Sequence, residues 1–262
     1  MTHDVFVLSD VGCVRGHNED DAAVLPEHQV YAVADGMGGH SSGEIASQLS
    51  VRAFSSVYID NERAKQVKKE WKREREERGS DCVPTLAEYH LRYAVTHANE
   101  TIFSHAARKP ALGDMGTTLV ALAFSGSRVY VAFVGDSRAY RYRDGKIEQL
   151  TEDHSLLNDY KKIQKLTPEE EENFPHKNII VRALGMKDSV EVDVVTATPQ
   201  EGDILVLCSD GLNGEISDDE ILSRVLEFEE DLDGGVESLI EGACENGGKD
   251  NVTVVLVKYV SD

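Results

Sequence analysis

The sequence has few cysteines and lacks long apolar runs. Cys13, Cys82, Cys208 and Cys244 are far apart and form no C-x-x-C pair, so neither a disulfide framework nor a zinc site is indicated. No apolar run approaches membrane-spanning length. The first residues also lack the basic and apolar regions of a signal peptide. We therefore expect a soluble protein in the reducing cytoplasm, with no membrane partner.

Basic residues are scarce as well. The chain has 27 Lys and Arg against 48 Asp and Glu, which gives a net charge of −21. Such a charge disfavours nucleic acid or an anionic membrane as a partner and suits cation binding. There is no Pro- or Ser-rich linker and no internal repeat. The hydrophobic content of 40% suffices for one sizeable core, so residues 1–262 are predicted to form a single domain.

A carboxylate stands at the end of a strongly apolar stretch. Residues 31–34 are Tyr-Ala-Val-Ala, and Asp35-Gly36-Met37-Gly38-Gly39 follows. A carboxylate at the end of a buried strand is held rigidly, and together with a main-chain oxygen it suits a cation. An alternative is an ordinary Asp-Gly turn. We expect such a turn at Asp144-Gly145, between two short polar strands.

The same pattern recurs along the chain. Asp210 and Asp250 also stand at ends of apolar strands, and Asp114 lies just before another. If these ends meet at one edge, the carboxylates repel each other unless a cation neutralises them. Oxygen ligands without a His/Cys cluster favour Mg²⁺ or Mn²⁺. Two such ions, about 3.5–4 Å apart, can share a water and clamp a phosphate. The alternative is a set of turn aspartates in an acidic protein.

Other polar residues precede the first of these strands. Arg15 offers a planar fork that suits a phosphate. Glu19 and Asp20, a few residues later, could orient metal-bound water.

The order of elements favours antiparallel sheets flanked by helices, because strands follow one another mostly as hairpins. Helical spacing of apolar residues predicts helices over 43–58 and 91–102. Residues 61–79 are nearly all charged and predict a solvated helix. Residues 151–186 are polar and irregular, which is typical of a surface flap.

The ordered set of motifs resembles the metal-dependent protein phosphatases of the type 2C family, especially their compact bacterial members. Each motif alone is weak, but the set is specific and covers essentially the whole chain. The matching stretches are Arg15-x-x-Asn18-Glu19-Asp20, Ala34 to His40, Met115-Gly116-Thr117-Thr118, Val134 to Arg138, Thr151 to His154, Ala183-Leu184-Gly185, Cys208 to Leu212 and Asp250-Asn251-Val252-Thr253.

The resemblance implies an α+β fold, a four-layer α-β-β-α sandwich of two antiparallel sheets flanked by helix pairs, with a flap subdomain. It also implies hydrolysis of phosphoserine and phosphothreonine by a metal-bridging water or hydroxide, without a phospho-enzyme. The substrates would be phosphoproteins, and the enzyme would oppose a cognate bacterial Ser/Thr kinase.

Residue roles follow from the same resemblance. Asp35 would bridge two Mn²⁺ or Mg²⁺ ions, and the carbonyl of Gly36 would bind one of them. Asp210 and Asp250 would hold the other ion. Asp114 with Asp210 would form a weaker third site. Arg15 would hold the substrate phosphate.

Two features depart from the family pattern. Many animal members have a histidine directly after Asp-Gly, as a proposed general acid, where this chain has Met37. Protonation of the leaving seryl oxygen would then come from metal-bound water or from another side chain, with His40 and His154 as candidates that are each equally compatible with a structural role. The charged segment 61–79 looks longer than in the compact relatives, as an insertion would.

Two other functions are compatible with parts of the sequence. Gly39 to Gly43 matches the G-x-S-x-G elbow of serine hydrolases, with Ser41, Asp136 and His154 as a nominal triad, but that fold needs a parallel sheet. A second alternative is a catalytically silent scaffold that binds phosphoproteins. Its signature would be lost metal ligands, whereas all the aspartates are present.

Overall fold

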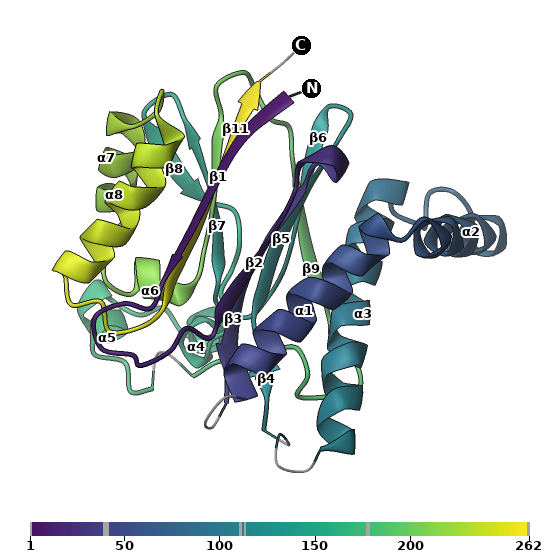
Figure 1. Cartoon of the computed structure of the whole chain (residues 1–262), viewed down its shortest axis with the longest axis horizontal. Helices are drawn as coiled ribbons and strands as arrows, with labels where there is room; N and C mark the ends of the chain where they lie inside the picture. The colour runs from purple at the N-terminus through teal and green to yellow at the C-terminus, as the bar shows by residue number, and fades with distance from the viewer. Residues whose placement is uncertain (1, 39–41, 110–111, 113, 177–178, 261–262) are drawn as a thin grey trace.

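Two antiparallel β-sheets pack face to face, with helices on both outer sides (Figure 1). The computed structural model describes residues 2–38, 42–109, 112, 114–176 and 179–260. The predicted α-β-β-α sandwich is confirmed, and so is its antiparallel strand order.

The first sheet pairs the two ends of the chain. Its edge strand β1 runs alongside the last strand β11, so both termini lie at the same end of the sandwich (Figure 1). In spatial order its strands are β1 (Thr2–Asp10), β11 (Val252–Val260), β10 (Ile204–Cys208), β7 (Arg138–Arg143) and β8 (Lys146–Gln149).

The second sheet is built around β3, the apolar strand that ends in Asp35-Gly36-Met37. In spatial order its strands are β2 (Asp20–Leu25), β3 (Val30–Met37), β5 (Leu119–Ser125), β6 (Arg128–Val134) and β9 (Asp193–Ala197), and the short β4 (Gly116–Thr117) pairs with the end of β3. The 3-10 helix η1 (Pro26–His28) joins β2 to β3.

Three apolar cores separate the four layers. In β3, Ala32 and Ala34 face the helices of the second sheet, whereas Tyr31 and Val33 face the first sheet. Both faces of β3 are therefore covered, which explains an apolar run without polar alternation. The covering helices are α1 (Ser42–Ile59) and α3 (Leu86–Arg108) on the second sheet, and α7 (Asp218–Glu227) and α8 (Leu232–Glu245) on the first.

The charged segment forms helix α2 (Asn61–Arg78), as predicted, and projects beyond α1 and α3 (Figure 1). Val67 is its one buried residue among those described. The Trp71 indole donates to the carbonyl of Pro84 over 2.9 Å and carries the Arg75 guanidinium 4.8 Å above its ring. One apolar residue and one tryptophan thus anchor an otherwise solvated helix.

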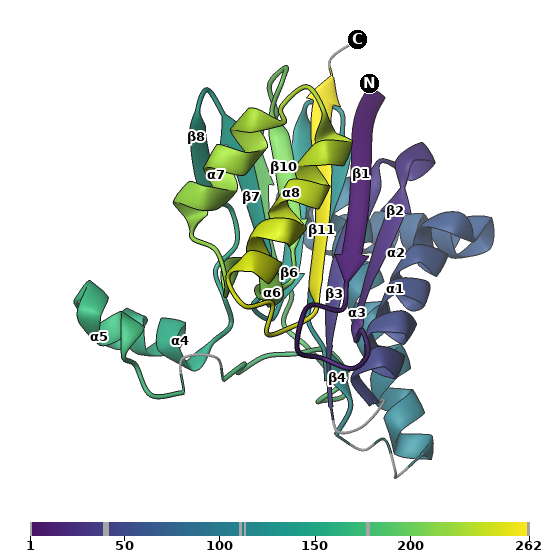
Figure 2. The ribbon, with the colours of Figure 1, turned by 60° about the vertical axis from the view of Figure 1, so that its left-hand side comes forward.

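The predicted flap, residues 151–186, leaves the sandwich and returns to it (Figure 2). It contains two short helices, α4 (Leu156–Ile163) and α5 (Pro168–Glu172), where the sequence predicted irregular structure. Local caps explain them: Ser155 caps α4, and Thr167 with Glu170 forms a capping box on α5. Lys161 and Glu171 join the two helices by a 2.7 Å ion pair.

The expected Asp-Gly turn also forms. Asp144 and Gly145 have φ of 49° and 71° and connect β7 to β8. In the described part of the chain, no helix combines the length and apolarity that a membrane crossing requires.

Candidate functional site

Four acidic side chains from different elements meet at one end of the sandwich. Strand register places Asp20, at the start of β2, directly opposite Asp35 of β3. Asp210 begins the short helix α6 (Asp210–Asn213) after β10, and Asp250 lies just before β11. The predicted convergence of Asp35, Asp210 and Asp250 at a sheet edge is therefore what the fold produces, since each affects the pKa of a neighbour in the group.

The backbone of Asp35 is fixed by two consecutive threonines. Its N–H donates to Thr118 Oγ1 over 3.0 Å, and its carbonyl accepts from Thr118 N and Thr117 Oγ1, both over 2.8 Å. The Thr118 hydroxyl also lies 2.6 Å from Ser137 Oγ. These hydrogen bonds fix the backbone at the end of β3, so the Asp35 carboxyl has little freedom to move away from its neighbours.

Two hydroxyls donate hydrogen bonds to the carboxylate of Asp20. Its Oδ2 accepts from Ser209 Oγ over 2.7 Å and from Thr253 Oγ1 over 2.8 Å, while its Oδ1 is buried without a partner. Ser9 Oγ lies 2.7 Å from Thr253 Oγ1, whose own proton goes to Asp20, so Ser9 is the donor in that pair. The hydroxyls thus fix one oxygen of Asp20 and leave the other without a hydrogen bond.

The carboxyls of Asp35 and Asp210 lie close enough for each to shift the pKa of the other. Burial raises the pKa of Asp35 well above its usual value, and the nearby charges of Asp20, Asp210 and Asp136 raise it further. Burial also raises the pKa of Asp210, although the neighbouring Asp35 carboxyl acts in the opposite direction. Burial, opposed by its two hydroxyl bonds, raises the pKa of Asp20 to about 7.

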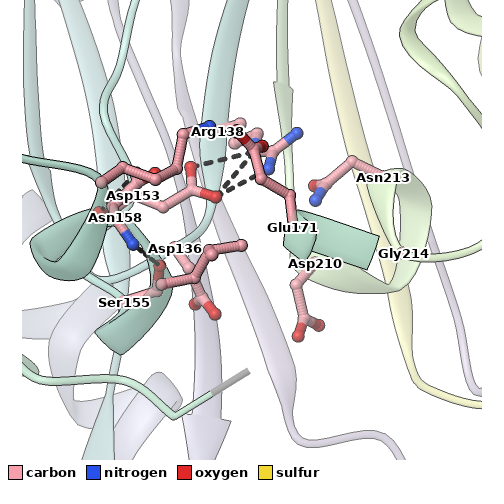
Figure 3. A pocket seen from close by; sticks show the side chains of 11 residues that line it. Asp136, Arg138, Asp153, Ser155, Asn158, Glu171, Asp210, Asn213 and Gly214 are labelled. Atoms are coloured by element: carbon pink, nitrogen blue, oxygen red, sulfur yellow. Dashed lines mark hydrogen bonds and ion pairs between the residues drawn. The ribbon is translucent and has the colours of Figure 1, made fainter. Parts of the chain in front are cut away.

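A fifth carboxyl belongs to the same group. Asp136 follows β6, its Oδ1 is buried without a partner, and burial and the charge of Asp210 raise its pKa to about 7. Figure 3 shows the carboxyls of Asp136 and Asp210 pointing to the same side of a pocket of about 390 Å³. Above them, Arg138 and Asp153 form a bidentate ion pair, at 2.7 Å between Nη2 and Oδ2. The flap contributes Asn158, Lys161 and Glu171 to the lining of this pocket.

The donor set fits hard divalent cations. Asp20, Asp136 and Asp210 each have a buried Oδ1 without a hydrogen bond, and a buried carboxylate oxygen is costly to leave unpaired. Among the residues described, no three His, Cys, Asp or Glu side chains are already arranged to enclose an ion. Burial and the neighbouring carboxylates raise the pKa values of Asp35 and Asp20, and a bound cation would compensate this negative charge.

Close packing brings the predicted carbonyl ligand to the same place. A Cβ on Gly36 would lie 2.2 Å from the carbonyl oxygen of Gly43, at the start of α1, and 2.5 Å from that of Glu19. Gly36 N also donates to Glu19 O over 3.1 Å. Only glycine fits here, and the end of β3 therefore meets both the loop before β2 and the first turn of α1. The Glu19 carboxylate accepts the N–H of His17 Nε2 across 3.1 Å.

The loop that carries Arg15, residues 11–19, is held by Asn251. The amide of Asn251 donates to the carbonyls of Val11 and His17 over 2.9 and 3.0 Å and accepts from Glu19 N over 2.8 Å. Arg15 itself is half exposed and pairs with Asp250 at 2.7 Å. The arginine predicted to bind phosphate therefore lies at the exposed edge of the cluster of carboxyls, next to Asp250.

The structure brings Arg15, Glu19, Asp20, Asp35, Gly36, Asp210 and Asp250 together, but not every predicted residue. Asp114 is exposed, and it is not among the groups that most affect the pKa of Asp210. His40 lies outside the described residues. His154 is buried, and both of its ring nitrogens have hydrogen-bond partners. Its Nδ1 accepts from Gly135 N over 3.1 Å, so Nε2 carries the proton and donates to Asp193 over 2.8 Å. Both ring nitrogens of His154 are thus engaged in holding β6, β9 and the flap together.

Sequence reasoning missed four contributors. Asp136 had a readable signal, because it follows an apolar strand and a glycine as the predicted ligands do. Ser209, Asn251 and Thr253 lie inside the stretches that match the family, but their roles were not predicted, because a hydroxyl or amide beside an aspartate becomes meaningful only when its distant partner is known. Their partners Asp20 and Val11 are more than 180 residues away in the chain.

Together, the sandwich and the cluster of carboxyls define an α+β protein whose donor set suits hard cations beside the half-exposed Arg15. The model of the family described as protein phosphatase 2C matches residues 14–241. The serine/threonine phosphatase Stp of Listeria monocytogenes is 36% identical over 253 residues, which cover 95% of this chain and 93% of Stp. This chain belongs to the protein phosphatase 2C family.

Solved structures agree with this assignment. The crystal structure of the Mycobacterium tuberculosis serine/threonine phosphatase PstP/Ppp is similar, with a TM-score of 0.84 and 34% identity over 100% of both chains. The catalytic domain of PstP in complex with two manganese ions has a TM-score of 0.80 and 32% identity over 99% of each chain. The serine-hydrolase alternative is wrong, because it needs a parallel sheet, whereas the described strands of both sheets pair antiparallel.

Proposed function

We propose that this protein is a metal-dependent protein serine/threonine phosphatase that hydrolyses phosphoserine and phosphothreonine on proteins. The observation that carries the proposal is the group of buried carboxyls with unpaired oxygens beside Arg15. The names of the relatives support the reaction, since Stp and PstP are both serine/threonine phosphatases.

The aspartates would hold the cations. Asp35 and the carbonyl of Gly36 stand on β3, and Asp210 and Asp250 approach from the first sheet. Oxygen donors of this kind suit Mn²⁺ or Mg²⁺, and PstP binds two manganese ions. Two such ions lower the pKa of a water that they share and polarise a phosphate oxygen. Asp114 with Asp210 remains the proposed third, weaker site.

Arg15 would bind the substrate phosphate. Its guanidinium is exposed enough to reach a ligand and is now occupied by Asp250. An Asp250 carboxylate that serves a cation attracts Arg15 less, so cation binding and phosphate binding at Arg15 support each other. Asp20 and Glu19 would orient water, since the Oδ1 of Asp20 has no hydrogen-bond partner while its Oδ2 is anchored.

The proton for the leaving seryl or threonyl oxygen would come from metal-bound water or from a side chain. Met37 occupies the position of the histidine found in many animal members, so His40 and His154 are the side-chain candidates. For His154 this role requires that the ring leave Gly135 and Asp193, which cover both of its nitrogens. A His154→Gln variant that keeps the wild-type pH profile of kcat would eliminate it.

The scaffold alternative lacks support. A silent phosphoprotein-binding module would tolerate loss of metal ligands, whereas Asp35, Asp210 and Asp250 are intact and clustered. The relatives described above, Stp and PstP, are both named as phosphatases.

The test is hydrolysis of p-nitrophenyl phosphate and of a phosphothreonine peptide by protein stripped with chelator and then titrated with Mn²⁺ or Mg²⁺. Asp35→Asn and Asp210→Asn should lose activity by at least about a hundredfold while keeping the fold. Asp144→Asn is the matched control, because Asp144 also precedes a glycine but lies in a surface turn. Full activity in chelator, or in Asp210→Asn, would refute the proposal.

A cognate Ser/Thr kinase as substrate, and with it a role in signalling, follows from the resemblance to bacterial phosphatases. We expect the protein to dephosphorylate an autophosphorylated Ser/Thr kinase of the same cell, and inactivity toward all such kinases would count against this. A cytoplasmic location remains a proposal too, supported by four free cysteines among the described residues. Fractionation of cells that express the tagged protein would test it.

A further inference from the structure

The fold brings two cysteines together that the sequence keeps apart. Cys13 lies in the Arg15 loop and Cys244 near the end of α8, 231 positions further on. The Sγ of Cys13 is 3.8 Å from the carbonyl oxygen of Cys244, and the Cys13 side chain is close enough to shift the pKa of the Cys244 thiol. This contact places the two cysteines next to each other, which is the first requirement for a disulfide between them.

The surroundings of Cys13 fit its thiol closely. Cys13 N donates to Gly248 O over 2.7 Å, which holds the loop against the segment after α8. A Cβ on Gly248 would lie 2.9 Å from Cys13 Sγ, and the φ of Gly248 is +54°. Glycine at position 248 therefore leaves the room in which the Cys13 thiol lies beside Cys244.

The four cysteines differ in access. Cys208 is fully buried in β10, and Cys82 is exposed in the connection between α2 and α3. Cys13 is exposed and Cys244 partly so. Burial and the neighbouring Cys13 raise the pKa of the Cys244 thiol to about 11, so Cys13 is the thiol that an oxidant in solution meets first.

We propose that Cys13 and Cys244 form an oxidisable dithiol site whose disulfide ties the Arg15 loop to helix α8. With hydrogen peroxide as the oxidant, the Cys13 sulfur attacks the peroxide, the O–O bond breaks, and sulfenic acid and one water form. The Cys244 sulfur then displaces the hydroxyl of the sulfenic acid as a second water. Two thiols lose two hydrogen atoms in total, and one peroxide is reduced to two waters.

The cross-link acts on the segment that positions the phosphate ligand. Arg15 is two residues after Cys13, and Gly248 is two residues before Asp250, its ion-pair partner. A covalent tie at Cys13 limits how far the loop can move, and Arg15 must leave Asp250 to bind a phosphate. This consequence rests on the proposed phosphatase function, whereas formation of the disulfide does not.

The direct test is mass spectrometry of the intact reduced chain after brief exposure to hydrogen peroxide, followed by mapping of the non-reduced peptides. We expect loss of two hydrogen atoms and a linked Cys13–Cys244 peptide in the wild type and in the Cys82→Ser control. Cys13→Ser and Cys244→Ser should form no linked peptide. The wild-type chain should also resist oxidation of Cys13 to sulfinic acid better than Cys244→Ser does. Absence of the linked peptide, or equal sulfinic acid in both, would overturn the site.

The second readout is phosphatase activity after removal of the peroxide. We expect kcat/KM of the oxidised wild type to fall several-fold, mainly through KM, and to recover with dithiothreitol. Cys244→Ser should keep its activity through the same treatment. A cross-linked chain with unchanged kcat/KM would overturn the effect on Arg15. A reduced chain that hydrolyses nothing would instead count against the proposed function, and the peptide map would still decide the dithiol site.

Discussion

Replacement of Asp136 by asparagine should stabilise the protein in chelator at alkaline pH. Asp136 is 7% exposed, its Oδ1 has no hydrogen bond, and burial with the charge of Asp210 raises its pKa from 3.8 to about 7. Above pH 7 the folded chain must therefore keep a charge in a place that penalises it. Asparagine has nearly the same shape and carries no charge at any pH.

The magnitude follows from the pKa shift. A rise from 3.8 to about 7 is roughly three units, which corresponds to about 4 kcal/mol of lost stability for the ionised form. Because the folded chain holds this proton more tightly than the unfolded chain, the contribution of Asp136 is fully present below about pH 4 and is lost as the pH rises through about 7. The amide must still be buried, so we expect a net gain of about 1–3 kcal/mol at pH 8.

The assay is urea denaturation in chelator at pH 8 and at pH 5. Asp136→Asn should have the higher free energy of unfolding at pH 8, and the difference should shrink toward zero at pH 5, where wild-type Asp136 is protonated. Asp81→Asn, a change at an exposed loop aspartate, is the control and should show neither effect. An Asp136→Asn variant that gains nothing at pH 8, or gains equally at both pH values, would refute the electrostatic reasoning.

Three further predictions concern the Arg15 loop and cation binding. Asn251→Ala removes three hydrogen bonds to residues 11–19. It should lower the free energy of unfolding, measured by urea denaturation, by about 2–4 kcal/mol and should raise KM. Unchanged stability would show that other contacts hold the loop. Gly12→Ala places a Cβ 2.2 Å from the carbonyl oxygen of Asp250 at a φ of +75° and should lower the free energy of unfolding by more than about 2 kcal/mol. Gly126→Ala, at a φ of +56° with nothing within 4 Å of the new Cβ, should lower it by only about 1 kcal/mol. Equal losses would show that close packing at Gly12 has no effect. Mn²⁺ affinity measured by calorimetry should fall as the pH drops from 8 to 6, because protons on Asp20 and Asp35 compete with the ion, and a pH-independent affinity would contradict the raised pKa values.

Much of the fold could be predicted because its signals are local. The uninterrupted apolar run of β3 and the helical spacing of α1 and α3 each occupy one short stretch of sequence. The helices of the flap were missed because they are short, and their amphipathic character is weak evidence without the caps at Ser155 and Thr167.

The candidate site was predictable to the extent that one rule, a carboxylate at the end of an apolar strand, selects Asp35, Asp210 and Asp250. The same rule would have selected Asp136, which follows β6 after one glycine. The contacts that tune the site could not be predicted. The hydroxyls on Asp20, the amide of Asn251 and the contact between Cys13 and Cys244 all join residues from opposite ends of the chain.

The central claim is that the buried carboxyls hold the cations on which hydrolysis depends. The most direct measurement is calorimetric titration of chelator-stripped protein with Mn²⁺ at pH 8, with Asp210→Asn and Asp144→Asn measured in parallel. We predict two tightly bound ions per chain for the wild type and for Asp144→Asn, and loss of at least one of them in Asp210→Asn. Binding to Asp210→Asn with wild-type stoichiometry and affinity would contradict the account.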